Sequence, residues 1–294
     1  MTMDPSATLF TDPDMASIFS GEAHVQAIVQ FESALARAQA RAGVIPVEAA
    51  DAIAAACESA RLDAGTLYAQ AVPAGTLAIP LVKALTAQAG DAGRYVHWGA
   101  TSQDAIDTAL MLQMRAACNL LVTRLLDIGG NLSRLAEEHR HSPMVGRTLM
   151  QQALPITFGL KAARWLALIT RQIERLRALS FVIQLGGAVG TLASLGDRGA
   201  LVSELLAEEM RRDDPGMPWH TERDRIVDVT SAVGSIAGAM AKIAGDVLLL
   251  SQTEVGEVSE ATGEGKGGSS AMPHKRNPVD ATFAVAASRL ALAH

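Results

Sequence analysis

A run of about forty residues, from Ser102 to Ser142, constrains the fold of this chain more than any other feature, because it contains no proline and repeats apolar residues at helical spacing. At a rise of about 1.5 Å per residue, such a helix would be roughly 60 Å long, which favours a helical bundle. A kink is expected only at Gly129-Gly130. The apolar positions are Ile106, Leu110, Met114, Leu121, Leu125, Ile128, Leu132 and Leu135.

Two further long helices are predicted, from Pro155 to about residue 180 and from Arg225 to Glu260. The second contains small residues such as Gly234 and Gly238, which let neighbouring helices approach closely. Apolar residues make up 49% of the chain and aromatic residues 4%, a composition that favours close-packed helices over sheets. No segment alternates cleanly with a period of two. We therefore predict an all-α fold whose core is a long-helix bundle.

Shorter helices are expected at residues 20–42, 47–60, 77–89 and 199–211, whereas residues 1–20 are expected to be irregular. Ser20 can cap the first of these helices and Gly43 can end it. We accordingly divide the chain into a small helical N-terminal domain, residues 1–101, and a central long-helix domain, residues 102–294. The last helical pattern begins at Val279 and has no stop signal, which predicts a shortened C-terminal end.

The charge pattern argues against several classes of partner. The chain has 25 Lys and Arg against 31 Asp and Glu, a formal net charge of −6, and no basic stripe, so nucleic acid is not an expected partner. The N-terminus lacks the pattern of a signal peptide. The most apolar helices contain Lys161, Lys242 or Asp246, which argues against membrane spans. A cytoplasmic protein is expected.

The segment from Gly263 to Pro278 differs from the helical patterns on both sides of it. It combines four glycines with the hydroxyls of Ser269 and Ser270, the cation of Lys275 and the amide of Asn277. Such a segment suits an active-site loop, although a polar linker between helices has the same composition. Its Gly263-x-Gly265-x-x-Gly268 pattern follows a helix instead of a strand, which argues against a dinucleotide site. The pair His139 and His141 lacks supporting ligands, so neither a metal nor a cofactor is expected.

Two other loops concentrate polar residues beside long helices. The first reads His-Trp-Gly-Ala-Thr-Ser-Gln-Asp from His97 to Asp104, and the second reads Gly-Arg-Thr-Leu-Met-Gln-Gln from Gly146 to Gln152. Thr101 or Ser102 can cap the long helix, whose free N–H groups would then attract an anion. Simple capping and ordinary loop contacts remain the alternative for both loops.

These loops together resemble the fumarase/aspartase superfamily, which includes adenylosuccinate lyase and argininosuccinate lyase. The resemblance rests on Gly-Ser-Ser-Ala-Met-Pro-His-Lys-Arg-Asn-Pro at residues 268–278, on Thr-Ser-Gln-Asp at residues 101–104 and on Gly-Gly-Ala-Val-Gly-Thr at residues 186–191. It covers the chain from about residue 10. Within the superfamily, residues 218–225 (Pro-Trp-His-Thr-Glu-Arg-Asp-Arg) look most like the branch of cycloisomerases, which close a tricarboxylate diene to a lactone.

The resemblance implies a homotetramer in which different subunits build each active site, and a small tricarboxylate as the substrate. Long helices of roughly 60 Å independently favour such sharing, because the two ends of a helix cannot easily meet within one chain. The implied catalytic residues are Ser269, which exchanges the proton, with Ser270 and Lys275. The implied substrate-binding residues are His97, Thr101, Ser102, Arg147, Thr148, Gln151, Arg223, Met272 and Asn277.

One position departs from the superfamily pattern. Lyases of the superfamily carry Thr-His in the second loop, where this chain has Thr148-Leu149. A lactonising enzyme tolerates this loss, because its nucleophile is a substrate carboxylate that is already ionised at neutral pH. The expected activity is therefore cycloisomerisation. A lyase that releases fumarate and an inactive helical paralogue remain alternatives.

Overall fold

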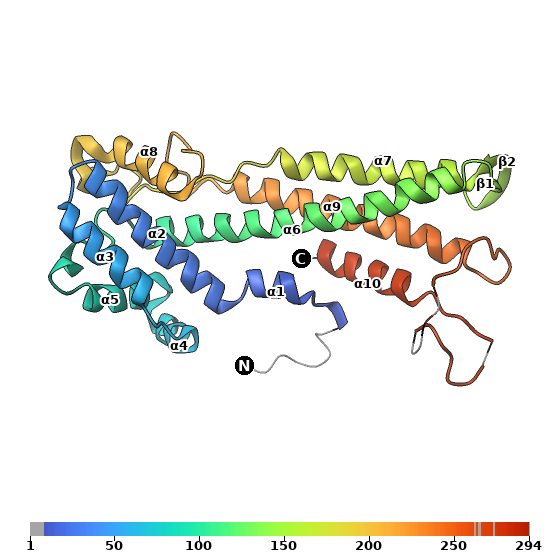
Figure 1. The fold of residues 1–294 in the computed structure, drawn as a ribbon, viewed down its shortest axis with the longest axis horizontal. Coiled ribbons are helices and arrows are strands. Elements are labelled where there is room, and N and C mark those ends of the chain that lie inside the picture. Colours follow the sequence, from blue (N-terminus) through green and yellow to red (C-terminus); the bar gives the residue numbers. More distant parts are fainter. Residues whose placement is uncertain (1–8, 262, 264–265, 273, 294) are drawn as a thin grey trace. The chain divides into compact units, whose positions relative to one another are not determined.

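The computed structural model describes residues 9–261, 263, 266–272 and 274–293 (Figure 1). Most of these residues are helical, as predicted, and they form two compact units. The N-terminal unit contains Thr11–Leu120 and Ser180–Arg225, and the long-helix unit is built on Leu121–Leu179 and on the chain from Ile226. These two units do not test the predicted domains, residues 1–101 and 102–294, which stay a prediction.

The long helix α6 (Ser102–Glu138) contributes its first half to the N-terminal unit and its second half to the long-helix unit. The other elements of the N-terminal unit are α1 (Pro13–Ile18), α2 (Gly21–Arg41), α3 (Val47–Ser59), α4 (Ala64–Ala74), α5 (Ala78–Gln88), η2 (Gly90–Tyr95), η3 (Ala193–Arg198) and α8 (Gly199–Met210). Those of the long-helix unit are β1 (Pro143–Thr148), β2 (Gln151–Thr157), α7 (Phe158–Arg177), α9 (Asp224–Leu250) and α10 (Val279–Ala293).

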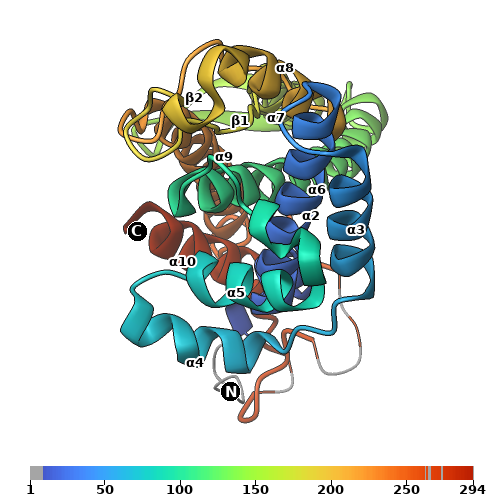
Figure 2. The same cartoon turned by 90° about the vertical axis from the view of Figure 1, so that its left-hand side faces the viewer.

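The N-terminal unit is organised around the buried face of α2. Ser20 caps this helix as predicted, since its hydroxyl accepts a hydrogen bond from Ala23 N at 3.1 Å. The side chains of Ile28, Phe31 and Leu35 are at most 1% exposed and lie in one core with residues of α3 and α8. Figure 2 shows α2 and α3 side by side. The four short helices predicted from the sequence are confirmed.

Two short helices, α1 and α4, were not predicted from the sequence. An aspartate caps each of them: Asp12 Oδ1 accepts a hydrogen bond from Met15 N at 2.9 Å, and Asp63 Oδ1 accepts one from Thr66 N at 2.8 Å. Pro13 is compatible with α1 because it lies in the first turn, where its missing N–H leaves no hydrogen bond unmade. The expectation that residues 1–20 are irregular is therefore wrong for Pro13–Ile18.

The expectation that no strand occurs, with a loop at residues 144–154 and a helix from Pro155, is also wrong. This segment is an antiparallel hairpin in which Thr148 pairs with Gln151, and a bulge lies between Val145 and Arg147. The bulge and Pro155 break the alternation that would have marked the strands. Helix α7 begins only at Phe158, where Thr157 Oγ1 accepts a hydrogen bond from Leu160 N at 3.1 Å.

Helix α6 runs through Gly129-Gly130 as a single helix. Helix α9 ends at Leu250, well before the predicted Glu260. The chain turns back there, because Gly256 adopts a φ of 60° and Glu257 N donates a hydrogen bond to Leu250 O at 3.0 Å.

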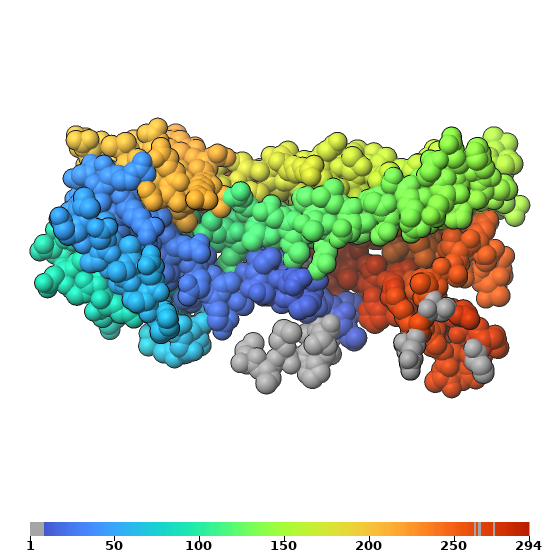
Figure 3. All heavy atoms as spheres, in the orientation of Figure 1, coloured from blue at the N-terminus to red at the C-terminus, as the bar shows by residue number. Residues whose placement is uncertain are grey.

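By length and composition alone, α6 and α9 could cross a membrane, which is weak evidence because core helices of soluble proteins pass the same test. Their most apolar stretches are only 33% and 22% buried within the chain. Figure 3 shows α6 at the surface over much of its length. Both helices thus expose apolar side chains, for example Leu126 at 49% and Leu249 at 45%.

Candidate functional site

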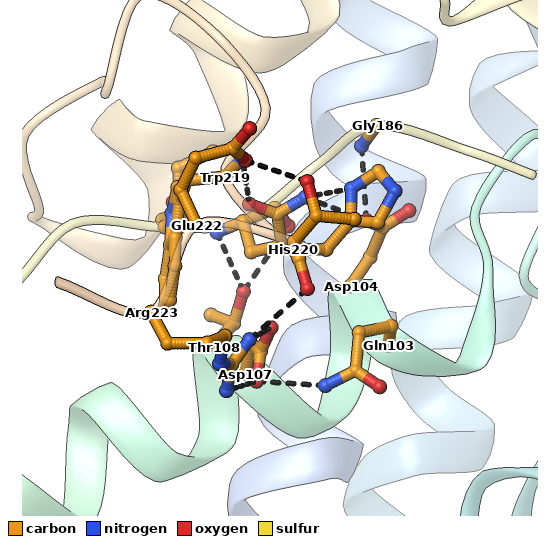
Figure 4. A network of polar contacts seen from close by, with 12 residues as sticks. Gln103, Asp104, Asp107, Thr108, Gly186, Trp219, His220, Glu222 and Arg223 are labelled. Carbon is orange, nitrogen blue, oxygen red and sulfur yellow. Dashed lines mark hydrogen bonds and ion pairs between the residues drawn. The ribbon is translucent and has the colours of Figure 1, made fainter. Parts of the chain in front are cut away.

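A buried carboxylate, Asp104, joins two of the sequence motifs in the N-terminal unit (Figure 4). Its Oδ1 accepts hydrogen bonds from Gly186 N at 2.9 Å and Gln184 Nε2 at 3.1 Å. Its Oδ2 accepts hydrogen bonds from Thr101 N and Gly187 N, both at 2.9 Å. Because Asp104 lies in the first turn of α6, these four donors hold the first loop and the Gly-rich turn against the start of that helix.

Gln184 extends the network to a third segment. Its Oε1 accepts a hydrogen bond from Trp219 N at 2.8 Å, so its amide nitrogen is the donor toward both Asp104 and His220 Nδ1, the latter at 3.1 Å. Trp219 Nε1 also donates to Ile183 O at 2.8 Å. The segment at residues 218–223 is thereby fixed beside the Gly-rich turn.

Glycine is required where the first loop meets this turn. Gly99 has a φ of 74°, and a Cβ added to it would lie 2.7 Å from Leu195 Cδ2. Gly187 has a φ of 68°, and a Cβ there would lie 2.9 Å from Gly99 O. The two backbones therefore meet at a distance that excludes side chains.

Arg223 lies at the edge of the same network, paired with a carboxylate of the protein. Its two terminal nitrogens bind the oxygens of Asp107 at 2.7 and 2.8 Å, and its guanidinium lies 5.6 Å from the centre of the Trp219 ring. The hydrogen bond to Asp107 raises the pKa of Arg223. Asp107 is 1% exposed and also accepts a hydrogen bond from Gln103. Arg223 thus compensates a buried charge.

The second loop forms the tip of the hairpin in the long-helix unit. Arg147 binds Glu257 through two hydrogen bonds of 2.7 and 2.9 Å. The same hydrogen bond raises the pKa of Arg147 and lowers that of Glu257. Thr148 and Gln151 are exposed and face each other across the last pair of the hairpin.

The turn between these two residues is strained. Leu149 and Met150 have φ values of 47° and 64°, the left-handed conformations of a two-residue hairpin turn that normally contains Asn-Gly. Their side chains are 96% and 75% exposed. An apolar pair in this position costs stability in the isolated chain, and such strain is typical of functional or contact sites.

Replacing Leu149 by Asn together with Met150 by Gly should raise the free energy of unfolding by about 1–2 kcal/mol, because both residues then suit the turn. Urea unfolding followed by circular dichroism measures this change. The control Leu154→Thr removes an equally exposed apolar side chain from β2 without touching the turn. Equal stability of the double variant and the control would show that the turn is not strained.

A cavity of about 550 Å³ is lined by residues of β1, β2, α7 and α9. Asp246 on its wall accepts a hydrogen bond from Trp165 Nε1 at 2.8 Å and pairs with Lys161 at 3.2 Å and with Lys242. Burial alone would raise the pKa of Asp246, but the hydrogen bonds from Lys242 and Trp165 and the two lysine charges lower it overall. Arg164 also lines the cavity. Its polar wall is therefore mainly cationic.

The Gly-rich segment closes on itself through hydrogen bonds to Gly267 and Gly268. Asn277 N donates to Gly267 O at 2.8 Å, and Asn277 Nδ2 donates to Gly268 O at 3.3 Å. Inside this loop, Ser269 Oγ accepts hydrogen bonds from Ala271 N at 3.3 Å and Met272 N at 3.1 Å. These N–H groups would stabilise negative charge on the Ser269 oxygen.

Other residues of this segment are exposed, including Ser270, Met272 and Lys275. Gly265, part of the rejected dinucleotide pattern, and Pro273 lie outside the described residues.

The predicted site residues thus occupy three places. His97, Thr101, Ser102 and Arg223 lie in the N-terminal unit, whereas the hairpin residues and the Gly-rich segment lie in the long-helix unit. The sequence did not single out Gln184, Glu257 or Glu32, the partner of His97. Gln184 is a lone polar residue in an apolar stretch, and Glu32 is one of several polar residues in the α2 segment, next to Ser33. Neither pattern indicates a functional role before the partners of these residues are known.

The comparisons with known proteins cover nearly the whole chain. The model of a family described as "Lyase" matches residues 8–289. A 3-carboxy-cis,cis-muconate cycloisomerase from Bradyrhizobium diazoefficiens is 49% identical over 97% of this chain and 65% of its own length. A nitrosuccinate lyase from Streptomyces davaonensis is 45% identical over 90% of this chain and 59% of its own length.

Among solved structures, the 3-carboxy-cis,cis-muconate lactonizing enzyme from Pseudomonas putida matches with a TM-score of 0.91 and 47% identity. The match covers 98% of this chain and 66% of that one. The chain therefore spans about two thirds of the length of the relatives that it matches.

Proposed function

Because this chain belongs to the lyase family of the fumarase/aspartase superfamily, we propose that it is a cycloisomerase that converts 3-carboxy-cis,cis-muconate to a carboxymuconolactone in the breakdown of aromatic compounds. The observation that carries the proposal is that four relatives named 3-carboxy-cis,cis-muconate cycloisomerase are 47–49% identical to this chain over at least 95% of its length. Leu149 in place of the lyase histidine supports the same choice.

The proposed reaction is an intramolecular addition. A carboxylate oxygen of the substrate attacks one carbon of a C=C bond, and a C–O bond forms. The π electrons move to the adjacent carbon, which lies α to another carboxylate and takes up a proton. Starting from the fully ionised tricarboxylate, the reaction takes up one proton, which comes from solvent through the protein, and the lactone keeps two free carboxylates. Counted as neutral acids, substrate and product are isomers.

We assign this proton transfer to Ser269. A serine hydroxyl is a weak acid, so the alkoxide that it leaves requires stabilisation. The N–H groups of Ala271 and Met272 already point at Ser269 Oγ, at 3.3 and 3.1 Å. The cation of Lys275 in the same segment would add to this effect. Among the described residues, no such donors are found for Ser270, which makes it the second choice.

Three substrate carboxylates need cationic and hydroxyl partners. Arg147 and Arg223 suit this role because a guanidinium can bind a carboxylate through two nitrogens. In this chain they bind the carboxylates of Glu257 and Asp107. The loops would therefore exchange a protein carboxylate for a substrate carboxylate when the site assembles. The remaining candidates are His97, Thr101, Ser102, Thr148, Gln151, Met272 and Asn277.

We further propose a cytoplasmic homotetramer whose subunits share active sites, without nucleic acid or membrane as a partner. The exposed apolar faces of α6 and α9 support assembly, because burial against other copies would remove them from water. The exposed hairpin tip is a second apolar surface of this kind.

The decisive assay is incubation of the purified protein with 3-carboxy-cis,cis-muconate, with the loss of diene absorbance followed over time. We expect loss of absorbance without fumarate release. A lyase is the second candidate, favoured by the 45% identity to the nitrosuccinate lyase. Fumarate release from nitrosuccinate or another succinyl compound, with no reaction of the diene, would replace the cycloisomerase proposal by that one. No reaction with either would favour the inactive paralogue.

A further inference from the structure

The buried face of α2 carries two polar side chains that its packing does not require. Glu32 is 1% exposed and Gln39 is 0% exposed, and apolar side chains such as Phe31 and Leu35 surround them in the core. Residues seven positions apart lie on the same face of a helix, two turns from each other. Burying an amide and a carboxyl group is unfavourable unless both are hydrogen-bonded, so their partners explain why they are there.

The two side chains bind adjacent residues of the first loop, Glu32 the ring of His97 and Gln39 the carbonyl oxygen of Trp98. Glu32 Oε1 lies 2.6 Å from His97 Nδ1, and Gln39 Nε2 donates to Trp98 O at 2.5 Å. His97 adopts a φ of 60°, a left-handed conformation that few residues other than glycine adopt. Two buried groups from one helix thus hold this short stretch in an unfavourable conformation.

Glu32 is an incomplete structural anchor. Its second oxygen, Oε2, is buried and has no hydrogen-bond partner among the described residues, and the same holds for Gln39 Oε1. A leucine at position 32 would serve the core better, because a buried, half-satisfied carboxyl group destabilises a fold. The benefit of this carboxylate must therefore come from what it does to His97.

The electrostatic surroundings make His97 more cationic. Burial alone would lower the pKa of His97, but the hydrogen bond that the ring donates to Glu32 and the charges of Glu32 and Asp104 raise it overall. Those two carboxylates, on α2 and α6, are the charged groups that act on the ring; Arg94 on η2 lies over Tyr95, at 4.8 Å. The protonated ring uses Nδ1–H for Glu32 and keeps Nε2–H for another acceptor. The side chain is 16% exposed, so an acceptor can reach it.

We propose that Glu32 is a positioning residue, which orients His97 through Nδ1 and presents its Nε2–H to a carboxylate of the substrate. This proposal rests on the proposed cycloisomerase function. Glu32 does not touch the substrate, because it is buried beneath the ring. Its role is to fix which nitrogen faces outward and to keep a positive charge beside Thr101 and Ser102, the other candidates of that loop.

The test is the variant Glu32→Gln, which keeps the shape but removes the charge. Without the carboxylate, His97 should lose its proton at a lower pH than in the native protein. In the native protein, the raised pKa keeps His97 protonated until the pH rises through that pKa. Carboxylate binding should therefore decline at a lower pH in Glu32→Gln than in the native protein. Between the titration midpoints of His97 in the native protein and in the variant, we expect kcat/KM of the variant to be lower by about tenfold, mainly through KM, with recovery at lower pH.

The matched control is Glu58→Gln, the same change at an exposed position of α3 in the same unit. It should leave the pH profile unmoved. A purely structural role of Glu32 would lower stability without shifting the pH profile, and that outcome would overturn the proposal.

A second measurement does not depend on turnover. NMR of protein labelled at histidine Cε1, with the His97 signal identified by its loss in His97→Asn, follows the titration of this ring directly. Addition of propane-1,2,3-tricarboxylate should shift the His97 signal in the native protein. An unshifted signal, or the same titration midpoint in Glu32→Gln, would overturn the proposal even if the diene is converted. Failure to convert the diene, with the His97 shifts as expected, would instead reject only the cycloisomerase function.

Discussion

The variant Ser269→Ala should lose roughly 10²–10⁴-fold in kcat while its far-ultraviolet circular dichroism stays unchanged. The reason is local: the Ser269 oxygen is held by the N–H groups of Ala271 and Met272, and alanine leaves these donors without an oxygen to stabilise. The loss should appear in kcat, because the proposed role of the hydroxyl is to transfer the proton in the transition state. Stopped-flow measurement of diene absorbance gives both kinetic constants.

The matched control is Ser270→Ala, which removes the neighbouring hydroxyl from an exposed position. It should cost much less. Near-normal activity of Ser269→Ala, with inactivity of the control, would move the proton transfer to Ser270. Mixing Ser269→Ala with an Arg147→Met variant extends the test, because refolded hybrids regain activity only if different subunits supply the two residues.

The variant Asp104→Ala should lower the free energy of unfolding by on the order of 4 kcal/mol, a large effect for one residue. Alanine leaves four buried donors without an acceptor, namely three backbone N–H groups and the amide of Gln184. Thermal unfolding and urea titration, followed by circular dichroism, measure the change. Because these donors belong to two segments, the first loop and residues 184–187, the loss of Asp104 should also make residues 97–101 and 186–190 more susceptible to proteolysis.

Asp51→Ala serves as the control for Asp104→Ala, since Asp51 is an exposed aspartate in α3 and its loss should alter stability by less than about 0.5 kcal/mol. The variant Asp104→Asn separates charge from shape. It should recover part of the stability, because its one carbonyl oxygen can still accept from some of the donors. A loss below about 1 kcal/mol in Asp104→Ala would show that the loops hold their conformation without the carboxylate.

Local sequence signals predicted the features that local interactions determine. The cap at Ser20 and the proline-free run of α6 are examples, since each depends on residues a few positions apart. The hairpin was missed because its strands lack alternation and its turn contains Leu149-Met150 instead of Asn-Gly. The early end of α9 depends on a backbone turn at Gly256, and glycines occur in that helix as well.

The residues of the candidate site also fall into two groups, those that a sequence motif marks and those that only the fold brings together. Motifs made Ser269, Arg147 and Arg223 candidates, because residue type and neighbouring residues indicate what chemistry they could perform. The pairs Arg147–Glu257 and His97–Glu32 join residues 110 and 65 positions apart, and nothing near either glutamate marks it as a partner. Long-range pairing of charges follows from the fold, so it became visible only in the structure.

The contact between Gly187 and the carbonyl of Gly99 bears on how new activities can arise on this scaffold. Neither loop can change its backbone path without losing both the glycine contact and the hydrogen bonds to Asp104. Val189, in the same turn, is 75% exposed, and its side chain takes part in neither of these interactions. Divergence toward other substrates would therefore proceed by exchange of outward side chains on a fixed frame. A library built at Val189 should yield altered specificity far more often than one built at either glycine.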